Sequence, residues 1–170
     1  GQSVTANNCD VRLDVVVVMD TSGSYCNDFI GVVMVRGLLP SGIGNYAEWT
    51  PYGSATNYEN VDETTPNDDT DYNHAITVNA KDSFVFQDLE NADAIIYGVS
   101  CAIYSKRVGA GNRTVCGLAR VSGTDGEGTV VYPPSSYNYM QSYLYVNPAT
   151  GSTWSGTFVN AAEFGYKLLS

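Results

Sequence analysis

The chain contains few basic residues and no long apolar run, and these two shortages limit its partners. Its 8 lysines and arginines stand against 18 aspartates and glutamates, which gives a formal net charge of -10. Proteins contact nucleic-acid phosphates largely through Lys and Arg. No apolar run approaches the roughly 20 residues that a membrane-spanning helix needs. We therefore expect neither nucleic acid nor a membrane among the partners.

The sequence also lacks the spaced motifs of common catalytic and metal sites. It has a single histidine, His74, and no Cys-x-x-Cys pair, Gly-x-Ser-x-Gly motif or glycine-rich phosphate loop. Nucleophilic catalysis, phosphoryl transfer and structural zinc depend on such groupings. A carboxylate pair of the kind that glycosidases use is compatible with the composition, but nothing singles out two acids. We predict no enzymatic activity, no catalytic residues, no metal site and no cofactor.

No segment from residue 74 onward has the period of a helix, whereas several segments alternate with a period of two. Between Ser136 and Val146 the odd positions carry tyrosine at 137, 139, 143 and 145. Phe164, Tyr166 and Leu168 alternate in the same way, and Phe84 and Phe86 lie on one face of a further run. Only a strand places neighbouring residues on opposite faces. This patterning predicts an all-β protein, an antiparallel β-sandwich of jelly-roll type.

The length and the local patterns predict one domain over residues 1–170. With 170 residues, of which 44% are hydrophobic, the chain is long enough to bury a substantial core. We expect N-terminal strands within residues 1–40, among them Asp10–Asp20 and Phe29–Leu39, with Pro40 ending the second. We expect a long irregular loop over residues 41–73 and the sandwich core over 74–170. The loop carries acids between Glu59 and Asp71, for which hydration and calcium binding are both open.

Four cysteines offer one candidate disulfide within the fold and leave a second pairing open. Ala94–Tyr104 and Thr114–Val121 have strand-like composition on either side of a glycine-containing stretch, Arg107–Asn112, which favours a hairpin. Cys101 and Cys116 lie on its opposite arms, so a cross-strand disulfide is one expectation and two buried thiols are the alternative. Cys9 and Cys26 lie in polar segments and pair either with each other or with a neighbouring subunit.

Exposed aromatic side chains are candidates for contact with a sugar or a protein partner. The alternation between residues 136 and 146 places its tyrosines on one face, which forms a flat aromatic surface. Trp154 has two interpretations, a cover over one end of the core and a stacking platform for a ligand. Asn147–Gly151 contains Pro148 and Gly151 and predicts a stiff turn before Trp154. The candidate contact residues are Trp49, Trp154, Tyr137, Tyr139 and Tyr143.

One motif near the N-terminus resembles a known adhesion site. The string Asp20-Thr21-Ser22-Gly23-Ser24 follows a run of valines, as does the metal-binding signature of von Willebrand A-type domains. Such domains also need long helices on both faces of a parallel sheet, and this sequence offers no matching helical pattern. The resemblance implies a metal-dependent adhesion domain as an alternative function.

A second resemblance covers about residues 40–170. It rests on Glu48-Trp49-Thr50-Pro51, on the strings at 57–63, 66–72 and 81–86, and on Asn147-Pro148-Ala149-Thr150-Gly151-Ser152-Thr153-Trp154 followed by the string at 159–165. In order and spacing these resemble tailed-bacteriophage virion proteins of about this size. The family supplies no catalytic residues to transfer.

The phage resemblance implies a structural protein on the virion surface, made in the cytoplasm of a bacterial host. The first expectation is a capsid decoration protein that cements the shell, with a collar or fibre component as the alternative. The expected partners are the major capsid protein or neighbouring virion proteins, with homo-oligomers on the particle. A carbohydrate-binding module for host-surface glycans is an alternative from a different class, which would use the tryptophans and the tyrosine-bearing face.

Overall fold

The computed structural model describes residues 33–109 and 111–170. The chain divides into two compact units, Gly1–Arg36 and Gly37–Ser170. Asp10–Asp20, the adhesion-like motif, Cys9 and Cys26 lie outside the described residues, so the predictions made for them stay predictions. The same holds for a single domain over residues 1–170.

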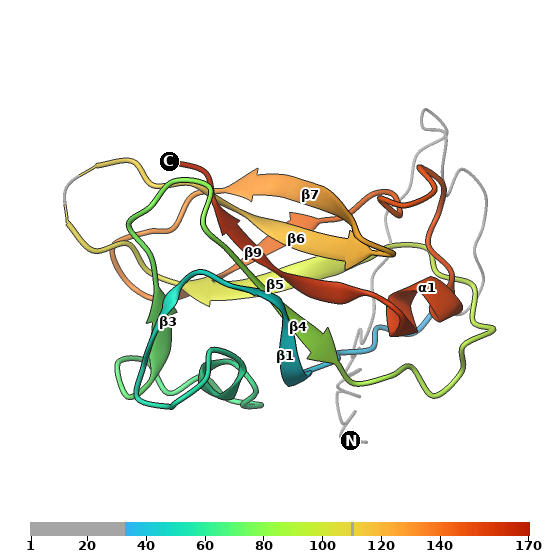
Figure 1. The fold of residues 1–170 in the computed structure, drawn as a ribbon, viewed down its shortest axis with the longest axis horizontal. Helices are drawn as coiled ribbons and strands as arrows, with labels where there is room; N and C mark the ends of the chain where they lie inside the picture. The colour runs from blue at the N-terminus through green and yellow to red at the C-terminus, as the bar shows by residue number, and fades with distance from the viewer. Residues whose placement is uncertain (1–32, 110) are drawn as a thin grey trace, which may run out of the picture. The chain divides into compact units, whose positions relative to one another are not determined.

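The described residues form nine strands, two short helical segments and connecting loops. Their bounds are β1 Pro40–Ala47, β2 Thr50–Tyr52, η1 Tyr58–Asn60, β3 Tyr72–His74, β4 Lys81–Phe86, β5 Ser100–Ser105, β6 Val115–Val121, β7 Thr124–Val131, β8 Asn138–Tyr143, α1 Gly156–Asn160 and β9 Glu163–Leu168. Five strands make one antiparallel sheet in the order β1-β4-β9-β6-β7 (Figure 1). The all-β class and the antiparallel arrangement predicted from the alternation are confirmed.

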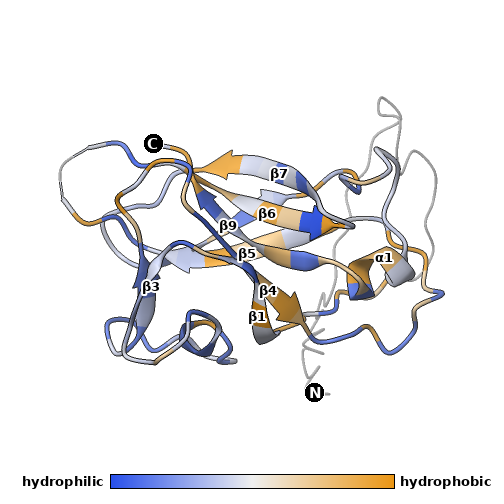
Figure 2. Cartoon of the chain, in the orientation of Figure 1, coloured by the Kyte–Doolittle hydropathy of each residue, from blue (hydrophilic) through white to orange (hydrophobic). Residues whose placement is uncertain are grey.

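A second layer, formed by β5 and β8, covers one face of the large sheet. Ile103 of β5 packs in one hydrophobic cluster with residues of β6, β7 and β9, namely Val115, Val131 and Leu168. A neighbouring cluster contains Leu144, which follows β8, together with Trp154 and Phe164. The core therefore lies between the two layers. Figure 2 shows hydrophobic residues concentrated in the strands, whereas the loops next to β3 are mostly hydrophilic.

The predicted hairpin around Arg107–Asn112 is wrong. β5 pairs with β8, from Ser100 opposite Tyr143 to Ser105 opposite Asn138, and β6 pairs with β7 and β9. The glycine-containing stretch thus connects the two layers of the fold. The hairpin partner of β6 is β7, reached through Ser122 and Gly123, whose φ angles of 49° and 84° suit a two-residue hairpin turn.

The strand predicted over Phe29–Leu39 is also wrong for residues 33–39, the part of it that the structure describes. Residues 33–39 form no strand, and β1 begins at Pro40 and pairs with β4. Proline is tolerated as the first residue of an edge strand, because the hydrogen bond that it cannot donate is not needed there. β1 runs through the start of the predicted loop 41–73, and β2, η1 and β3 add short regular segments to the remainder.

Four local predictions are confirmed, and the predicted absence of helix needs one correction. β4, β8 and β9 form where alternation placed strands, and the turn Asn147–Gly151 closes with a 2.8 Å hydrogen bond from the Gly151 amide to the Asn147 carbonyl. One five-residue helix, α1, interrupts the C-terminal part and is capped by the Ser155 side chain. The jelly-roll topology stays a prediction.

Candidate functional site

The solvent-facing side of β5 and β8 carries a row of tyrosines, which we call the tyrosine face: Tyr104, Tyr137, Tyr139, Tyr143 and Tyr145. The rings of Tyr104 and Tyr139 lie 4.6 Å apart between centroids, and those of Tyr104 and Tyr137 stack at 5.2 Å. The rings of Tyr143 and Tyr145 stack at 6.3 Å. Strand pairing places Ser100, Ala102 and Gln141 on the same face. The paired strands therefore present rings and neutral polar groups to solvent.

An acidic loop is fastened to one end of this face. The Tyr104 hydroxyl donates to an Asp68 carboxylate oxygen at 2.8 Å, and the Tyr137 hydroxyl donates to Asp69 at 3.0 Å. Lys106 also binds Asp69, at 2.6 Å, and its ammonium group lies 4.5 Å from the centre of the Tyr137 ring. The hydroxyls of Tyr104 and Tyr137 are thus occupied within the protein.

The carboxylate of Asp69 is neutralised by Lys106 and accepts a hydrogen bond from Tyr137. The hydrogen bonds from Lys106 and Tyr137 lower the pKa of Asp69 below its usual value. Burial and the hydrogen bond to Asp69 raise the pKa of Tyr137 well above its usual range. The carboxylate therefore stays ionised and the phenol stays protonated across the physiological pH range.

Tyr139, Tyr143 and Tyr145 form the free part of the tyrosine face. Their side chains are 55%, 49% and 71% exposed, respectively. No hydrogen bond from their hydroxyls is found among the described residues. Tyrosine offers a large, rigid contact area with a polar tip, a combination that is enriched at interfaces. The alternation predicted these exposed rings at 139 and 143, and it also accounts for the partly buried Tyr137.

The two tryptophans lie away from the tyrosine face. Trp154 is 5% exposed, and its indole nitrogen donates to the Leu144 carbonyl at 2.8 Å. Trp49 donates its indole N–H to the Ala80 carbonyl at 3.1 Å and packs edge-on against Tyr166 at 4.7 Å. Trp154 is thus a core residue, which removes it from the candidate contact surface, and Trp49 closes the end of the second hydrophobic cluster.

A buried carboxylate, Asp82, organises the segment that follows β1. It is fully buried, and one of its oxygens accepts from the backbone amides of Glu48 and Trp49 at 2.8 and 2.9 Å. The other oxygen accepts from the Asn57 side chain at 2.6 Å and from the Tyr166 hydroxyl at 3.2 Å. A buried charge is tolerated only when such donors replace water. Burial nevertheless raises the pKa of Asp82, and the hydrogen bonds oppose this effect.

Buried amides extend this network through residues 54–73. The Asn60 side chain donates to the Tyr72 carbonyl at 3.1 Å and to the Asn73 side chain at 2.9 Å, and it accepts from the Ser54 amide at 3.0 Å. Asn73 in turn donates to the Asn57 carbonyl at 2.7 Å. These contacts replace the regular backbone ladder that the segment lacks. They hold the loop that carries Asp68 and Asp69 in position.

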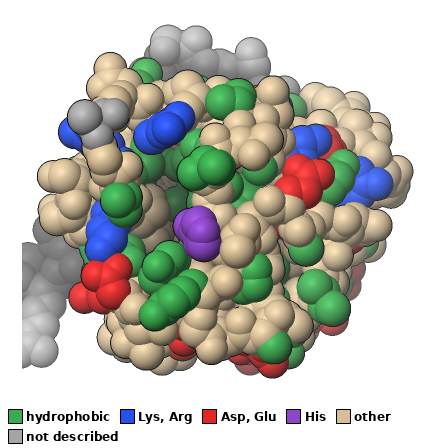
Figure 3. All heavy atoms as spheres, turned by 60° about the vertical axis from the view of Figure 1, so that its left-hand side comes forward, with side chains coloured by type: hydrophobic (Ala, Val, Ile, Leu, Met, Phe, Trp, Pro, Cys, Tyr) green, Lys and Arg blue, Asp and Glu red, His purple; other side chains and the backbone are tan. Residues whose placement is uncertain are grey.

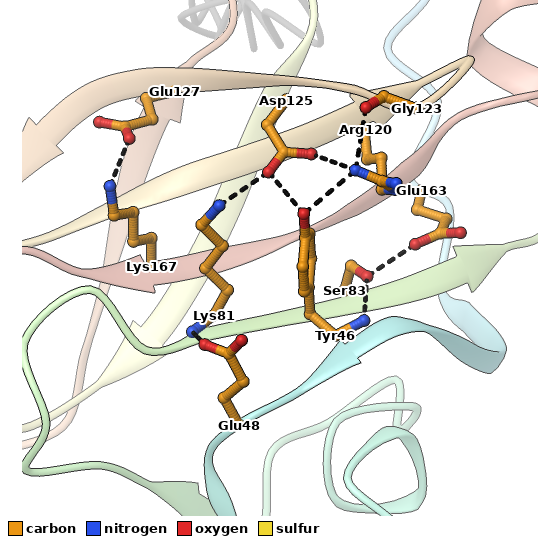
Figure 4. A network of polar contacts seen from close by, with 10 residues as sticks. All are labelled: Tyr46, Glu48, Lys81, Ser83, Arg120, Gly123, Asp125, Glu127, Glu163 and Lys167. Atoms are coloured by element: carbon orange, nitrogen blue, oxygen red, sulfur yellow. Dashed lines mark hydrogen bonds and ion pairs between the residues drawn. The ribbon is translucent and has the colours of Figure 1, made fainter.

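A third polar cluster covers the other face of the large sheet (Figure 4). Asp125 accepts hydrogen bonds from Lys81, Arg120 and the Tyr46 hydroxyl, at 2.7, 2.7 and 2.8 Å. Although burial opposes this effect, the three donors together lower the pKa of Asp125. Every member has a partner, and the cluster joins β1 to β4, β6 and β7. We interpret it as a structural network that fastens the edge strand β1.

The predicted disulfide is absent, because Cys101 and Cys116 are free thiols in the structure. A Cβ atom placed on Gly117 would lie 3.0 Å from the Cys101 sulfur, so position 117 faces β5. By strand alternation its neighbour Cys116 faces the opposite side of the sheet. Burial raises the pKa of Cys101 to about 12 and that of Cys116 to about 11. The alternative interpretation, two thiols without a disulfide, describes this arrangement, although Cys101 is only partly buried whereas Cys116 is fully buried.

The acidic residues of the loop bind groups of the protein itself. Asp68 and Asp69 bind the tyrosines and Lys106, and the Asn67 side chain lies between Glu63 and Asp71, at 3.3 and 3.0 Å. Within residues 33–109 and 111–170 no three acidic, histidine or cysteine side chains are grouped to hold a metal. In the same part of the chain no helix is long and apolar enough to cross a bilayer.

Comparison of the chain with protein-family models, curated proteins and solved structures finds no match. The described sheets are antiparallel, and the described residues contain a single α-helix of five residues. They therefore do not form the parallel sheet, covered by helices, of an A-type adhesion domain.

Proposed function

We propose that this protein is a non-enzymatic structural component of a tailed-phage virion, in the first place a decoration protein that cements the capsid. The strings that resemble phage proteins support the proposal, because they contain residues of the buried hydrogen-bond network, of a tight turn and of the hydrophobic core. The string at 57–63 supplies Asn57 and Asn60 of the amide network, and the string at 147–154 supplies the turn and the buried Trp154. The resemblance thus falls on residues that determine this fold.

The tyrosine face is the single observation that carries the adhesive role. The protein has a net charge of -10, yet the outer positions of β5 and β8 carry no charged side chain. The cores of protein interfaces are depleted in charge and enriched in aromatic residues. Three exposed tyrosines with free hydroxyls fit a contact with a neighbouring virion protein, which would bury the rings and satisfy the hydroxyls.

A decoration protein stabilises a shell by mass action. A ligand that binds only the assembled state at a concentration of 100 times its Kd adds about 2.7 kcal/mol for each site. Particles that lack this protein are therefore expected to assemble normally but to rupture at a lower temperature and under milder osmotic shock. The measurement compares DNA release from particles made with and without the protein. Equal resistance of the two preparations would contradict the cementing role, and a defect confined to host attachment would favour a collar or fibre component.

Glycan binding is the second candidate function, and the same exposed rings favour it. Aromatic rings stack on the apolar faces of sugars, and Gln141 lies between Tyr139 and Tyr143 along the strand, where an amide can bind hydroxyls. A glycan array probed with the whole protein separates the two functions. A cement protein shows no sugar preference at this face, whereas a receptor-binding module selects a glycan and loses it when Tyr143 is replaced by alanine.

A further inference from the structure

Two arginines of the compact unit, Arg107 and Arg113, have no carboxylate partner among the described residues. The other basic side chains of residues 37–170 each bind an acid: Lys81 and Arg120 bind Asp125, Lys106 binds Asp69, and Lys167 binds Glu127. In this protein acids outnumber bases by 18 to 8, yet these two arginines have no acidic partner in the described part of the chain. Both lie in the loop between β5 and β6, where Arg113 is exposed and Arg107 is partly buried.

Both arginines line the same hollow, which has a volume of about 240 Å³ and lies between the β5–β6 and β7–β8 loops. Its other lining residues are Asn112, Tyr132, Pro133 and Pro134. The hollow lies at the end of the β5–β8 layer. Figure 3 shows one face of the molecule, on which hydrophobic side chains lie around the single histidine, with basic side chains near them.

Hydrogen bonds within the two loops set the shape of this hollow. The Arg107 backbone amide donates to the Pro134 carbonyl at 2.8 Å and thereby joins the loops. One guanidinium nitrogen of Arg107 donates to the Gly111 carbonyl at 2.8 Å, which leaves its other N–H groups for a ligand. Two consecutive prolines restrict the backbone of the opposite wall. The site is therefore largely formed before any ligand binds.

The chemistry of the lining residues defines a ligand. A guanidinium presents a planar fork of donors that matches a carboxylate, and two such groups that lack a counter-ion among the described residues favour an anion at the hollow they line. Tyr132 is 70% exposed and, with the prolines, offers an apolar wall on which the C–H face of a ring can lie. The Asn112 amide can bind hydroxyls. The volume is below the roughly 300–1,000 Å³ of pockets for drug-sized ligands, so it suits a single ring.

We propose that this hollow binds a uronic acid, either free or as one residue of an acidic glycan. The carboxylate of the sugar accepts from Arg107 and Arg113, and its ring lies against Tyr132. Because the protein is acidic overall, the affinity comes from these local contacts and not from the general field. At 0.15 M salt the Debye length is about 8 Å, so the repulsion from distant acids is largely screened. The site is separate from the tyrosine face and does not depend on the virion role.

The test is calorimetric or NMR titration of the full chain with glucuronic acid, glucose and inorganic phosphate at 0.15 M salt. We expect saturable binding of glucuronic acid that is at least about tenfold tighter than that of glucose, because only the acid engages the arginines. Arg113→Gln is expected to weaken binding about tenfold or more, and Arg113→Lys, which keeps the charge but loses the planar fork, by less. Lys167→Gln, which removes one charge at a distant ion pair, is the matched control and leaves the affinity unchanged.

Several results would overturn this inference. The inference is wrong if glucuronic acid does not bind, if glucose binds as tightly as glucuronic acid, or if the Arg113→Gln variant binds glucuronic acid with unchanged affinity. Tight binding of phosphate without binding of the sugar acid would also reject a sugar site in favour of a simple anion site. If Arg113→Gln fails to fold, Tyr132→Ala provides the second variant, and it is expected to weaken glucuronic acid binding without affecting phosphate. A glycan-array signal confined to uronate-containing glycans would distinguish a glycan residue from a free acid as the ligand source.

Discussion

Replacing Asp82 by alanine is expected to lower the free energy of unfolding by about 3 kcal/mol or more, because several buried or partly buried donors lose their acceptor. The substitution removes the acceptor of the Trp49 amide, of one N–H of the Asn57 side chain and of the Tyr166 hydroxyl, whereas the Glu48 amide keeps its hydrogen bond to the Lys81 carbonyl at 3.0 Å. Each buried donor that loses its partner costs about 1–3 kcal/mol. Because small proteins are stable by only about 5–15 kcal/mol, the effect is large in a denaturant titration.

Asp69→Ala is the matched control for this substitution. Asp69 also accepts three hydrogen bonds, but its side chain is 68% exposed, so water replaces the lost donors. We expect its effect on unfolding to be small compared with that of Asp82→Ala. Similar losses for the two variants would mean that Asp82 does not organise the fold in the way its contacts indicate.

The pKa shift of Asp82 also determines the direction in which this residue makes the stability of the protein change with pH. Burial raises the pKa of this carboxyl in the folded state above its unfolded value. The folded state therefore binds the proton of Asp82 more tightly than the unfolded state does. The stabilisation of the folded state that results from this difference is complete at low pH and is lost as the pH rises through the folded pKa. The Asp82→Asn variant should lose this part of the pH dependence.

Replacing Gly165 by alanine is the second change with a large expected effect. Gly165 lies in the middle of β9, between Ser83 of β4 and Leu118 of β6. A Cβ atom at this position would lie 1.9 Å from the Asp82 carbonyl oxygen, a distance that no side-chain rearrangement relieves. The β4 and β9 backbones would have to separate at the centre of the sheet. We expect destabilisation of about 3 kcal/mol or more, the upper end of the range for overpacked sites.

Gly98→Ala is the control for Gly165→Ala, because a Cβ atom there meets no atom within 4 Å. This second variant should unfold at nearly the same denaturant concentration as the wild type. Thermal or urea unfolding followed by circular dichroism measures both variants. A Gly165→Ala protein as stable as Gly98→Ala would show that β4 and β9 are not packed as closely as described.

The strands that sequence alone predicted correctly are those whose alternation is strong. In β9 every second residue is aromatic or aliphatic, and β8 carries tyrosines at alternating positions in and around it, so each strand is recognisable without knowledge of its neighbours. The two longest strands that the sequence did not predict, β1 and β7, contain glycine. In β7, Gly126 and Gly128 make room for Pro148 and Ser142, since a Cβ atom would lie 2.8 and 2.6 Å from them. That packing reason is invisible in the local sequence.

Strand pairing was harder to predict than strand position. The pairing of β5 with β8 joins residues about 40 positions apart, and the glycine-containing stretch between β5 and β6 favoured the wrong, local pairing. The turn that does form a hairpin, Ser122-Gly123, is only two residues long and was passed over. The disulfide prediction failed with the hairpin, because it depended on the two cysteines lying on paired arms.

The candidate site was predictable only in part. Alternation placed the tyrosines on a common face, but it could not show that Asp68 and Asp69 occupy the hydroxyls of Tyr104 and Tyr137. Asp82 was missed, although one signal for it exists. It shares the inward face of β4 with Phe84 and Phe86, and an acid on an apolar face indicates a buried carboxylate with several donors.

The most direct test of the adhesive role is the affinity of the purified protein for particles assembled without it, measured for the wild type and for a Tyr139→Ala, Tyr143→Ala double variant. If the tyrosine face is the contact surface, the wild type binds saturably and the double variant binds about 100-fold more weakly or worse, since two interface hot spots are lost. Tyr132→Ala, which removes an exposed tyrosine outside that face, should bind like the wild type. Undiminished binding of the folded double variant would contradict the account.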